Sequence, residues 1–261
     1  MGIRGVFAGF FVLAIAVGCS RAQRDVVAPV VADVAAVGLL DAGDAVCTAT
    51  LLRERWLLTA AHCVRGRSVG DLRFTLHPRP LESKDASYAA ASTVRIHPHF
   101  RDRDDDPGVD VALVRLADSS YGAPVTEYPA LIEIDTLARG ATVWGLGFGV
   151  NPDGTHGFRR PLTMTFLEWD SITYGVDKLV RGLAVVVRGP KGEIGCAGDS
   201  GSPLLIRKGD RWAIAGIYST SEGDDHHHHL PERSDCRSGV TAGNYVAVSA
   251  FGGWLQAASK E

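Results

Sequence analysis

Short apolar stretches recur along the chain after residue 24. They are bounded by Gly, Pro, Asp or Asn, a pattern that favours the strands of an all-β barrel or sandwich. The stretches that predict strands are Ala35–Leu40, Thr48–Leu52, Trp56–Leu58, Val111–Leu116, Thr142–Trp144, Leu183–Val187, Trp212–Tyr218 and Tyr245–Val248.

Only the C-terminal tail has a convincing helical pattern. Phe251, Trp254, Leu255 and Ala258 recur at i, i+3, i+4 and i+7, which places them on one apolar face. Ser249 precedes them and is of a residue type that caps helix N-termini. The sequence therefore predicts a helix over residues 249–258.

The first residues have the pattern of a secretory signal. One arginine precedes the apolar run Val6–Val17, which is too short for a comfortable transmembrane span. Two processing sites compete. One is ordinary cleavage after Ala22, and the other is a bacterial lipobox, Ala16–Cys19, in which Cys19 becomes the lipidated first residue. The place of Cys19 directly after the apolar run favours lipidation.

Composition and cysteine content narrow the class of protein. The chain is 46% hydrophobic and 22% charged, as in ordinary soluble globular proteins. Its net charge of −3 gives no reason to expect a nucleic-acid partner. The cysteine count is 5, and removing Cys19 by cleavage or lipidation leaves an even number, suited to two disulfides in an oxidising compartment.

A glycine-rich stretch, Glu193–Ile206 (EIGCAGDSGSPLLI), places Ser200 in a tight bend. A serine exposed in this way suggests a nucleophile, which needs a base. His62 in LLTAAHC is the candidate base, although a lone histidine is more often structural. It adjoins Cys63, and Cys47 lies upstream at a spacing suited to joining two adjacent strands.

Asp110 opens the apolar stretch DVALVRL. An acid in this position must either face solvent or have a buried partner. Taken alone, it is as well explained as a turn residue at a strand end.

Together these motifs resemble the trypsin/chymotrypsin family of serine proteases. The likeness includes LTAAHC, DVALVRL and GDSGSP in the family's order of His, Asp and Ser, and Tyr245–Ser249 followed by Trp254. It covers about residues 26–258. CTATLL before LLTAAHC, and the turn Gly145–Gly147, are similar to bacterial members.

The resemblance implies two packed six-stranded antiparallel β-barrels with a C-terminal helix. On that basis we expect residues 1–24 to be a signal peptide and short pro-segment, and residues 25–261 to be the protease domain. The first barrel would cover about 26–129 and the second about 130–247, with the catalytic cleft between them.

The resemblance also implies the chemistry of a secreted serine endopeptidase. Ser200 is the expected nucleophile, His62 the general base, and Asp110 the acid that orients the imidazole. The N–H groups of Gly198 and Ser200 would form the oxyanion hole. The expected disulfides are Cys47–Cys63 and Cys196–Cys236.

Substrate preference follows from the same likeness. Ile194 stands where trypsin-like members carry an aspartate that selects Arg and Lys, and it offers no charge. Ser219, Thr220 and Ser221 align with one wall of the specificity pocket, and Gly243 with the opposite wall. We expect cleavage after uncharged, apolar, small-to-medium residues.

Activation in the family frees an amino terminus that inserts beside the acid preceding the nucleophile, here Asp199. The chain offers Arg24–Pro29, in which cleavage before Val26 would supply a new terminus. That cleavage would also detach the domain from a lipid on Cys19. The sequence-based hypothesis is therefore a zymogen released from its anchor on activation.

The alternative function is that of a catalytically weak protease homologue acting as an extracellular binding protein. An α/β-hydrolase is disfavoured by Ser202 and by the order of the motifs. We expect a monomeric enzyme that acts on polypeptides and needs no cofactor or metal. It would be secreted or periplasmic, or lipid-anchored to a bacterial membrane.

Three polar segments are weak candidates for functional sites. Arg101–Asp106 (RDRDDD) is predicted to be a solvated loop rather than a calcium loop. Glu222–His229 (EGDDHHHH) could bind a transition metal but is predicted to be a polar loop. Arg159 and Arg160 form a weak candidate for an exposed proteolytic site.

Overall fold

Six antiparallel strands close into a barrel in the N-terminal part of the computed structural model. The structure describes residues 34–53, 55–103, 108–118, 130–132, 137–151, 154–173, 179–189, 194–223 and 240–258. The strands of this barrel are β1 (Val37–Asp41), β2 (Val46–Arg53), β3 (Trp56–Thr59), β4 (Arg73–Thr75), β5 (Ala89–Ile96) and β6 (Ala112–Leu116). They pair in the order β1-β2-β3-β6-β5-β4, and a short 3-10 turn, η2 (Val69–Asp71), precedes β4.

The C-terminal part forms a second sheet with the order β11-β8-β9-β10-β13-β12-β7, and the additional β11–β12 pairing closes six of its strands into a barrel. These are β8 (Thr142–Gly147), β9 (Arg160–Thr173), β10 (Leu179–Arg188), β11 (Pro203–Lys208), β12 (Arg211–Gly223) and β13 (Val240–Ala247), all antiparallel, while β7 (Ala130–Leu131) adds to β12 in parallel. The predicted fold of two six-stranded barrels is confirmed.

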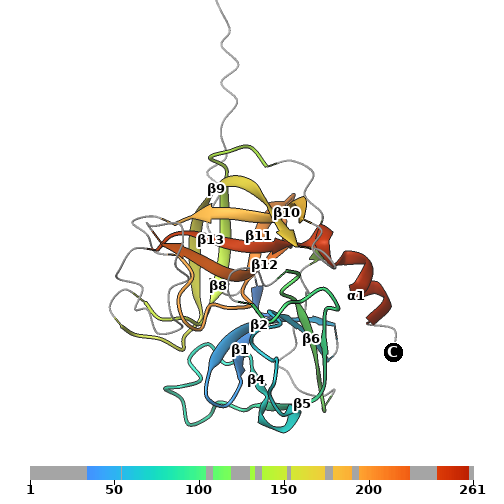
Figure 1. Ribbon diagram of the computed structural model, residues 1–261. Coiled ribbons are helices and arrows are strands. Elements are labelled where there is room, and N and C mark those ends of the chain that lie inside the picture. The colour runs from blue at the N-terminus through green and yellow to red at the C-terminus, as the bar shows by residue number, and fades with distance from the viewer. Residues whose placement is uncertain are drawn as a thin grey trace, which may run out of the picture.

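The two barrels lie one against the other (Figure 1), and one buried apolar cluster contains side chains from both. Trp144 on β8 and Leu205 on β11 belong to the same buried cluster as the side chains that fill the first barrel. A separate cluster, which includes Met164 and Tyr245, fills the second barrel. Close-packed apolar contacts of this kind hold two bodies in a fixed relation, so loops from opposite barrels can meet at their junction with defined geometry.

The C-terminal helix begins later than its sequence pattern predicts. Residues Val248–Ala250 form a 3-10 turn, η4, and the helix α1 covers Gly252–Ala258. Ser249 therefore lies within the turn and is not the helix cap, because the last strand leads into the tighter turn first. The predicted apolar face is present, since Leu255 and Ala258 are buried and Trp254 packs against the core.

Helix α1 returns the end of the chain to the first barrel (Figure 1). Arg95 at the end of β5 donates a hydrogen bond of 2.7 Å to the carbonyl of Ala258, an acceptor that the helix leaves without an intrahelical partner. Trp254 packs edge-on against His97, with ring centroids 5.1 Å apart. Among the described residues, no helix has the length and apolar character needed to cross a membrane.

Several predicted features lie outside the described residues. These are the signal segment with Cys19, Cys236, the run His226–His229, and the acidic residues 104–106. Asp102, at the start of the acidic segment, is exposed and pairs with Arg65.

Candidate active site

His62 lies in the turn that follows β3, and two bonds fix that turn. The predicted disulfide Cys47–Cys63 joins β2 to the residue after His62. The backbone N–H of His62 donates to Oδ1 of Asp110 at 2.9 Å. These two bonds fix the backbone that carries the imidazole of His62. The His62 side chain remains 29% exposed.

Asp110, two residues before β6, lies beneath the imidazole and is completely buried. Its Oδ2 is 2.6 Å from Nδ1 of His62 and accepts a hydrogen bond of 2.7 Å from the Ser219 hydroxyl on β12. With the backbone N–H of His62, the carboxylate therefore has three donors. Asp110 is thus not an exposed turn residue but a buried acid with partners from both barrels.

These three hydrogen-bond donors determine the protonation state of the Asp110 carboxyl. Burial raises the pKa of its carboxyl, but the charge and hydrogen bonds of His62, with the Ser219 hydroxyl, outweigh burial and leave the pKa below its ordinary value. An ionised carboxylate accepts only, so Nδ1 of His62 must carry the proton toward it. In the neutral imidazole, Nε2 then carries a lone pair and can accept a proton.

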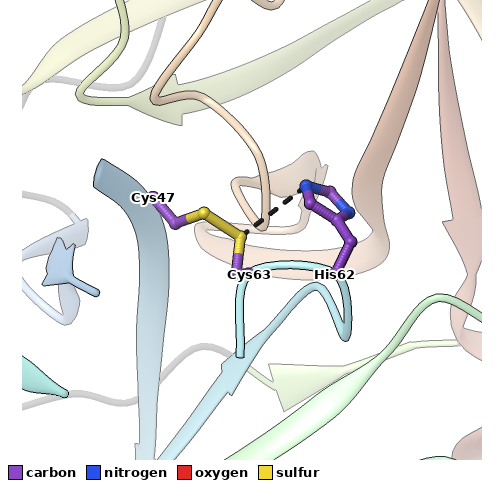
Figure 2. A group of neighbouring side chains, drawn as sticks. All are labelled: Cys47, His62 and Cys63. Atoms are coloured by element: carbon purple, nitrogen blue, oxygen red, sulfur yellow. Dashed lines mark hydrogen bonds between the residues drawn. A yellow bond between two sulfur atoms is a disulfide. The ribbon is translucent and has the colours of Figure 1, made fainter. Parts of the chain in front are cut away.

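The sulfur atoms beside His62 do not form a metal site. Cys47, His62 and Cys63 are close enough together to resemble a ligand set, and Sγ of Cys63 lies 3.8 Å from Nε2 of His62 (Figure 2). Both sulfurs belong to the disulfide, whereas the thiolate is the form that binds metal.

The loop that carries Ser200 is anchored on the strands that lead to His62. The N–H of Thr48 donates to the carbonyl of Ser200 at 2.8 Å. The next residue, Gly201, has a positive φ of 82°, and a Cβ there would lie 2.3 Å from both Thr48 O and Thr59 Oγ1. Only glycine fits this contact. Ser200 is therefore placed against the residue that follows Cys47, next to the disulfide that fixes His62.

Hydrogen bonds hold the backbone at Gly198 and Ser200, the two expected donors of an oxyanion hole, in a defined conformation. Gly198 has a φ of 98°, and its carbonyl accepts a hydrogen bond of 2.9 Å from the Thr48 hydroxyl. Within the described part of the chain, the N–H groups of Gly198 and Ser200 donate to no protein acceptor. Both residues are half-buried, so these two N–H groups remain available to a ligand at the junction of the barrels.

Asp199, the residue before Ser200, is completely buried. Its Oδ1 accepts from the N–H of Gly149 at 2.8 Å, and its Oδ2 accepts from the N–H of Cys196 at 3.0 Å. A third donor, Nη2 of Arg160, lies 2.8 Å from Oδ2. Asp199 therefore has a cationic partner within the domain, at the start of β9.

The prediction that Arg159 and Arg160 form an exposed proteolytic site is wrong. The Arg160 side chain is 14% exposed because it reaches into the second barrel toward Asp199. Arg159 donates to the carbonyl of Leu76 at 2.6 Å, and burial lowers its pKa to about 10.

The residues aligned with a specificity pocket surround a tyrosine that sequence reasoning missed. The Tyr218 hydroxyl donates to the Gly195 carbonyl at 2.9 Å and is hydrogen-bonded to Ser221. A Cβ on Gly243 would lie 2.6 Å from Cγ2 of Ile194 and 3.0 Å from the Tyr218 ring. The predicted pocket residues Ile194, Ser221 and Gly243 are thus brought together around one ring.

Two other predicted pocket residues have different contacts. The Ser219 hydroxyl is used by Asp110, and Thr220 Oγ1 accepts from the Asn244 amide at 3.4 Å. Cys196 is disulfide-bonded, while its predicted partner Cys236 lies outside the described residues. Arg160 and Thr48 are the other residues of the site that the sequence did not single out.

Comparison with known proteins agrees with this geometry. The family model described as Trypsin matches residues 28–232. The chain is 30% identical to mouse (Mus musculus) tryptase over 229 residues, which cover 80% of this chain and 77% of the relative. It is 27% identical to bovine (Bos taurus) chymotrypsin-like elastase family member 1 over 184 residues, which cover 66% of this chain and 67% of the relative.

These relatives are mammalian, so the bacterial type expected from the sequence stays a prediction. The match to the family model extends over most of the chain and includes the first barrel, the second barrel as far as β12, and all three motifs. The chain therefore belongs to the trypsin family of serine proteases.

Proposed function

We propose that this protein is a secreted serine endopeptidase that hydrolyses peptide bonds through an acyl-enzyme. The observation that carries the proposal is the contact of the partly exposed His62 with the buried Asp110, with 2.6 Å between Oδ2 and Nδ1, beside the anchored loop of Ser200. A carboxylate held at Nδ1 leaves Nε2 as the proton acceptor, which is the arrangement that general-base activation of a serine requires.

The mechanism follows from the roles of these groups. Ser200 Oγ forms a bond to the carbonyl carbon of the substrate while its proton passes to Nε2 of His62. The tetrahedral oxyanion accepts hydrogen bonds from the N–H groups of Gly198 and Ser200. The carbon–nitrogen bond then breaks as His62 gives the proton to the leaving amine. Water then forms a bond to the acyl carbon while His62 takes its proton. The bond from that carbon to Ser200 Oγ breaks, the acid leaves, and His62 returns the proton to Oγ.

Asp110 keeps its negative charge throughout these steps. It stabilises the imidazolium that forms when His62 takes the proton, and it does not itself become protonated. Two further donors hold the carboxylate in place, the His62 N–H at 2.9 Å and the Ser219 hydroxyl at 2.7 Å.

The enzyme is expected to react covalently with a fluorophosphonate probe at Ser200. The reaction requires the same activation of Oγ as peptide cleavage, so it separates an enzyme from the alternative, a family homologue that only binds a partner. Labelling is followed by mass spectrometry of the intact protein and its peptides. Ser200→Ala must abolish labelling, and Ser92→Ala, a change at an exposed serine on β5, must not. Failure of the folded wild-type protein to react would reject the proposal.

The side chain preferred before the cleaved bond is proposed to be small and uncharged. Ile194 is fully buried and carries no charge with which to pair a substrate cation, and burying an unpaired cation is costly. The ring of Tyr218 lies against Gly195 and Gly243, so it already occupies space beside Ile194.

In a peptide library, cleavage after Ala is therefore expected to exceed cleavage after Arg or Lys by about 100-fold in kcat/KM. Tyr218→Val is expected to shift the preference toward larger apolar residues. The neighbouring Tyr245→Phe keeps its ring, whose centroid is 5.1 Å from that of Tyr218, and should leave the profile unchanged. Fastest cleavage after Arg or Lys in the wild-type enzyme would contradict this preference.

The signal segment supports export, and Cys19 supports a lipid anchor of the bacterial kind. We propose an extracytoplasmic monomer with residues 1–24 as the signal and pro-segment. The mass of the amino-terminal peptide of the native protein tests the anchor, because lipidation adds acyl chains to Cys19 and ordinary cleavage removes that residue.

A further inference from the structure

Asp199 is the residue on which the amino terminus acts in the family, and here all of its described polar contacts come from within the folded domain. Two backbone N–H groups, of Gly149 and Cys196, and the guanidinium of Arg160 lie within 3.0 Å of its carboxylate oxygens. The carboxylate is fully buried, and the Arg160 side chain is nearly so. A buried carboxylate needs a charged partner of this kind.

The register of the second barrel explains how Arg160 reaches this position. Arg160 opens β9 and pairs with Gly147, the last residue of β8. A Cβ on Gly147 would lie 2.0 Å from Oδ1 of Asp199, and one on Gly149 would lie 2.4 Å from its Cγ. The carboxylate is therefore packed directly against the backbone of β8 and the turn that follows it, with the Arg160 guanidinium on its remaining side.

The position of this carboxylate determines the geometry of the oxyanion hole. Asp199 stands between Gly198 and Ser200, whose N–H groups are the two expected donors. Its own N–H donates to the Cys196 carbonyl at 2.8 Å, and its carbonyl accepts from the N–H of Ser202 at 2.9 Å. With the side chain fixed as well, rotation of the peptide units on either side of Asp199 is restricted, which preorganises both donors.

We propose that Arg160 is a positioning residue that takes the place of a cleaved amino terminus, so that the active site is assembled without activating proteolysis. The inference rests on the proposed function. The inference replaces the sequence-based hypothesis of a zymogen, because the Arg160 guanidinium already provides the positive charge that pairs with Asp199. It also removes the conflict between anchoring and activation, since a chain still attached to Cys19 would be active.

A second cation at Asp199 would meet two obstacles. An inserted ammonium would lie next to the guanidinium of Arg160, and like charges close together in a buried site repel each other. It would also have to displace one of the three donors within 3.0 Å of the carboxylate. The phenols of Tyr218 and Tyr245 share this region, and burial raises the pKa of both, so they supply no charge at neutral pH.

The first experiment compares two forms of the secreted chain, one that starts at Ser20 and one that starts at Val26. If Arg160 supplies the charge, both forms react with the fluorophosphonate at the same rate and have kcat/KM values within about 2-fold. Both also keep their activity when the pH rises above 8, where an α-amino group loses its proton.

Reaction of the Val26 form alone, with loss of activity above pH 8, would overturn the inference and leave the proposed function standing. Reaction of neither form would overturn the proposed function and this inference with it. The two failures are thus distinguishable.

The second experiment changes the cation in the Ser20 form. Arg160→Gln is expected to lower kcat by about 100-fold, the loss that follows from removing one oxyanion donor, with a smaller effect on KM. Arg160→Lys keeps the charge and should recover at least 10-fold of that loss. The matched control is Arg159→Gln, which removes a half-buried arginine that bonds Leu76 instead.

Thermal unfolding of each variant separates positioning from folding. Arg160→Gln must retain a cooperative transition, and the labelling rate is compared at a temperature where all variants are folded. Equal labelling rates for Arg160→Gln and Arg159→Gln would overturn the inference. So would a loss in Arg160→Gln that Arg160→Lys does not recover at all.

Discussion

Replacing His62 with alanine is expected to lower kcat about 10⁶-fold, and adding Ser200→Ala to this variant is expected to lower it no further. The reason is that the two side chains share one proton. A serine hydroxyl without a base is a weak nucleophile, and a base without the hydroxyl has nothing to activate. Residues that act as a unit in this way have strongly non-additive effects.

The measurement is kcat on a peptide substrate with Ala before the cleaved bond, for both single variants and the double variant. His99→Ala is the control, because His99 lies in the partly buried segment after β5 and its ring packs against that of His97. Residual activity should exceed the uncatalysed rate by about 10³-fold through the oxyanion hole and substrate binding. A double variant much slower than either single variant would contradict a shared proton.

The His62→Ala variant should still fold, since most of the anchors of its turn do not involve the imidazole. The Cys47–Cys63 disulfide and the backbone N–H of residue 62, which donates to Asp110 at 2.9 Å, both remain. Asp110 keeps the Ser219 hydroxyl as well. Loss of one donor to a buried charge costs about 1–3 kcal/mol of stability, which the change in thermal unfolding temperature will show.

The sequence predicted the parts of the fold that depend on local patterns. Short apolar stretches bounded by turn residues became strands, because each one fills one side of a barrel wall. His62, Asp110 and Ser200 were found because each lies in a motif with its own local signature, a half-cystine, an apolar strand or a glycine-rich bend. That all three act together is an expectation from the family resemblance alone, and of their side chains the structure shows the pair His62–Asp110 in contact, 2.6 Å apart.

What the sequence could not predict depends on register between distant segments. Arg160 looks like a surface residue beside Arg159, and only the pairing of Gly147 with Arg160 places it next to Asp199, 39 residues away along the chain. Tyr218 has the pattern of an ordinary core residue of β12. Its role near Gly195 and Gly243 depends on how β12 and β13 lie side by side.

The start of the helix was missed for a local reason. Ser249 has the right chemistry for a cap, but the strand β13 leads directly into a 3-10 turn that already uses Val248–Ala250. The described part of the helix comprises 7 residues. The two glycines at its start are tolerated because Leu255 and Ala258 are anchored in the core.

Asp110→Asn is expected to lower kcat about 10⁴-fold with little change in KM. Three donors converge on the carboxylate, from the His62 ring, the His62 backbone and Ser219. An amide has one oxygen and one NH₂ group, so it cannot accept all three. If its NH₂ faces the ring, Nδ1 must become the acceptor and the proton moves to Nε2, where it blocks transfer from Ser200. The control Asp44→Asn, at an exposed carboxylate that pairs with Arg67, should keep full activity.

The same variant has a stability signature whose direction follows from the lowered pKa of Asp110. The folded protein holds the carboxylate ionised at a pH where the unfolded chain, with an aspartate pKa near 3.9, takes up a proton. The stabilisation from this charge is therefore present in full above about pH 4 and lost as the pH falls below it. The amide that replaces the carboxylate does not titrate, so the difference in unfolding temperature between wild type and Asp110→Asn should shrink as the pH falls from 5 toward 3. A difference that stays constant over this range would mean that folding does not lower the pKa of the Asp110 carboxyl.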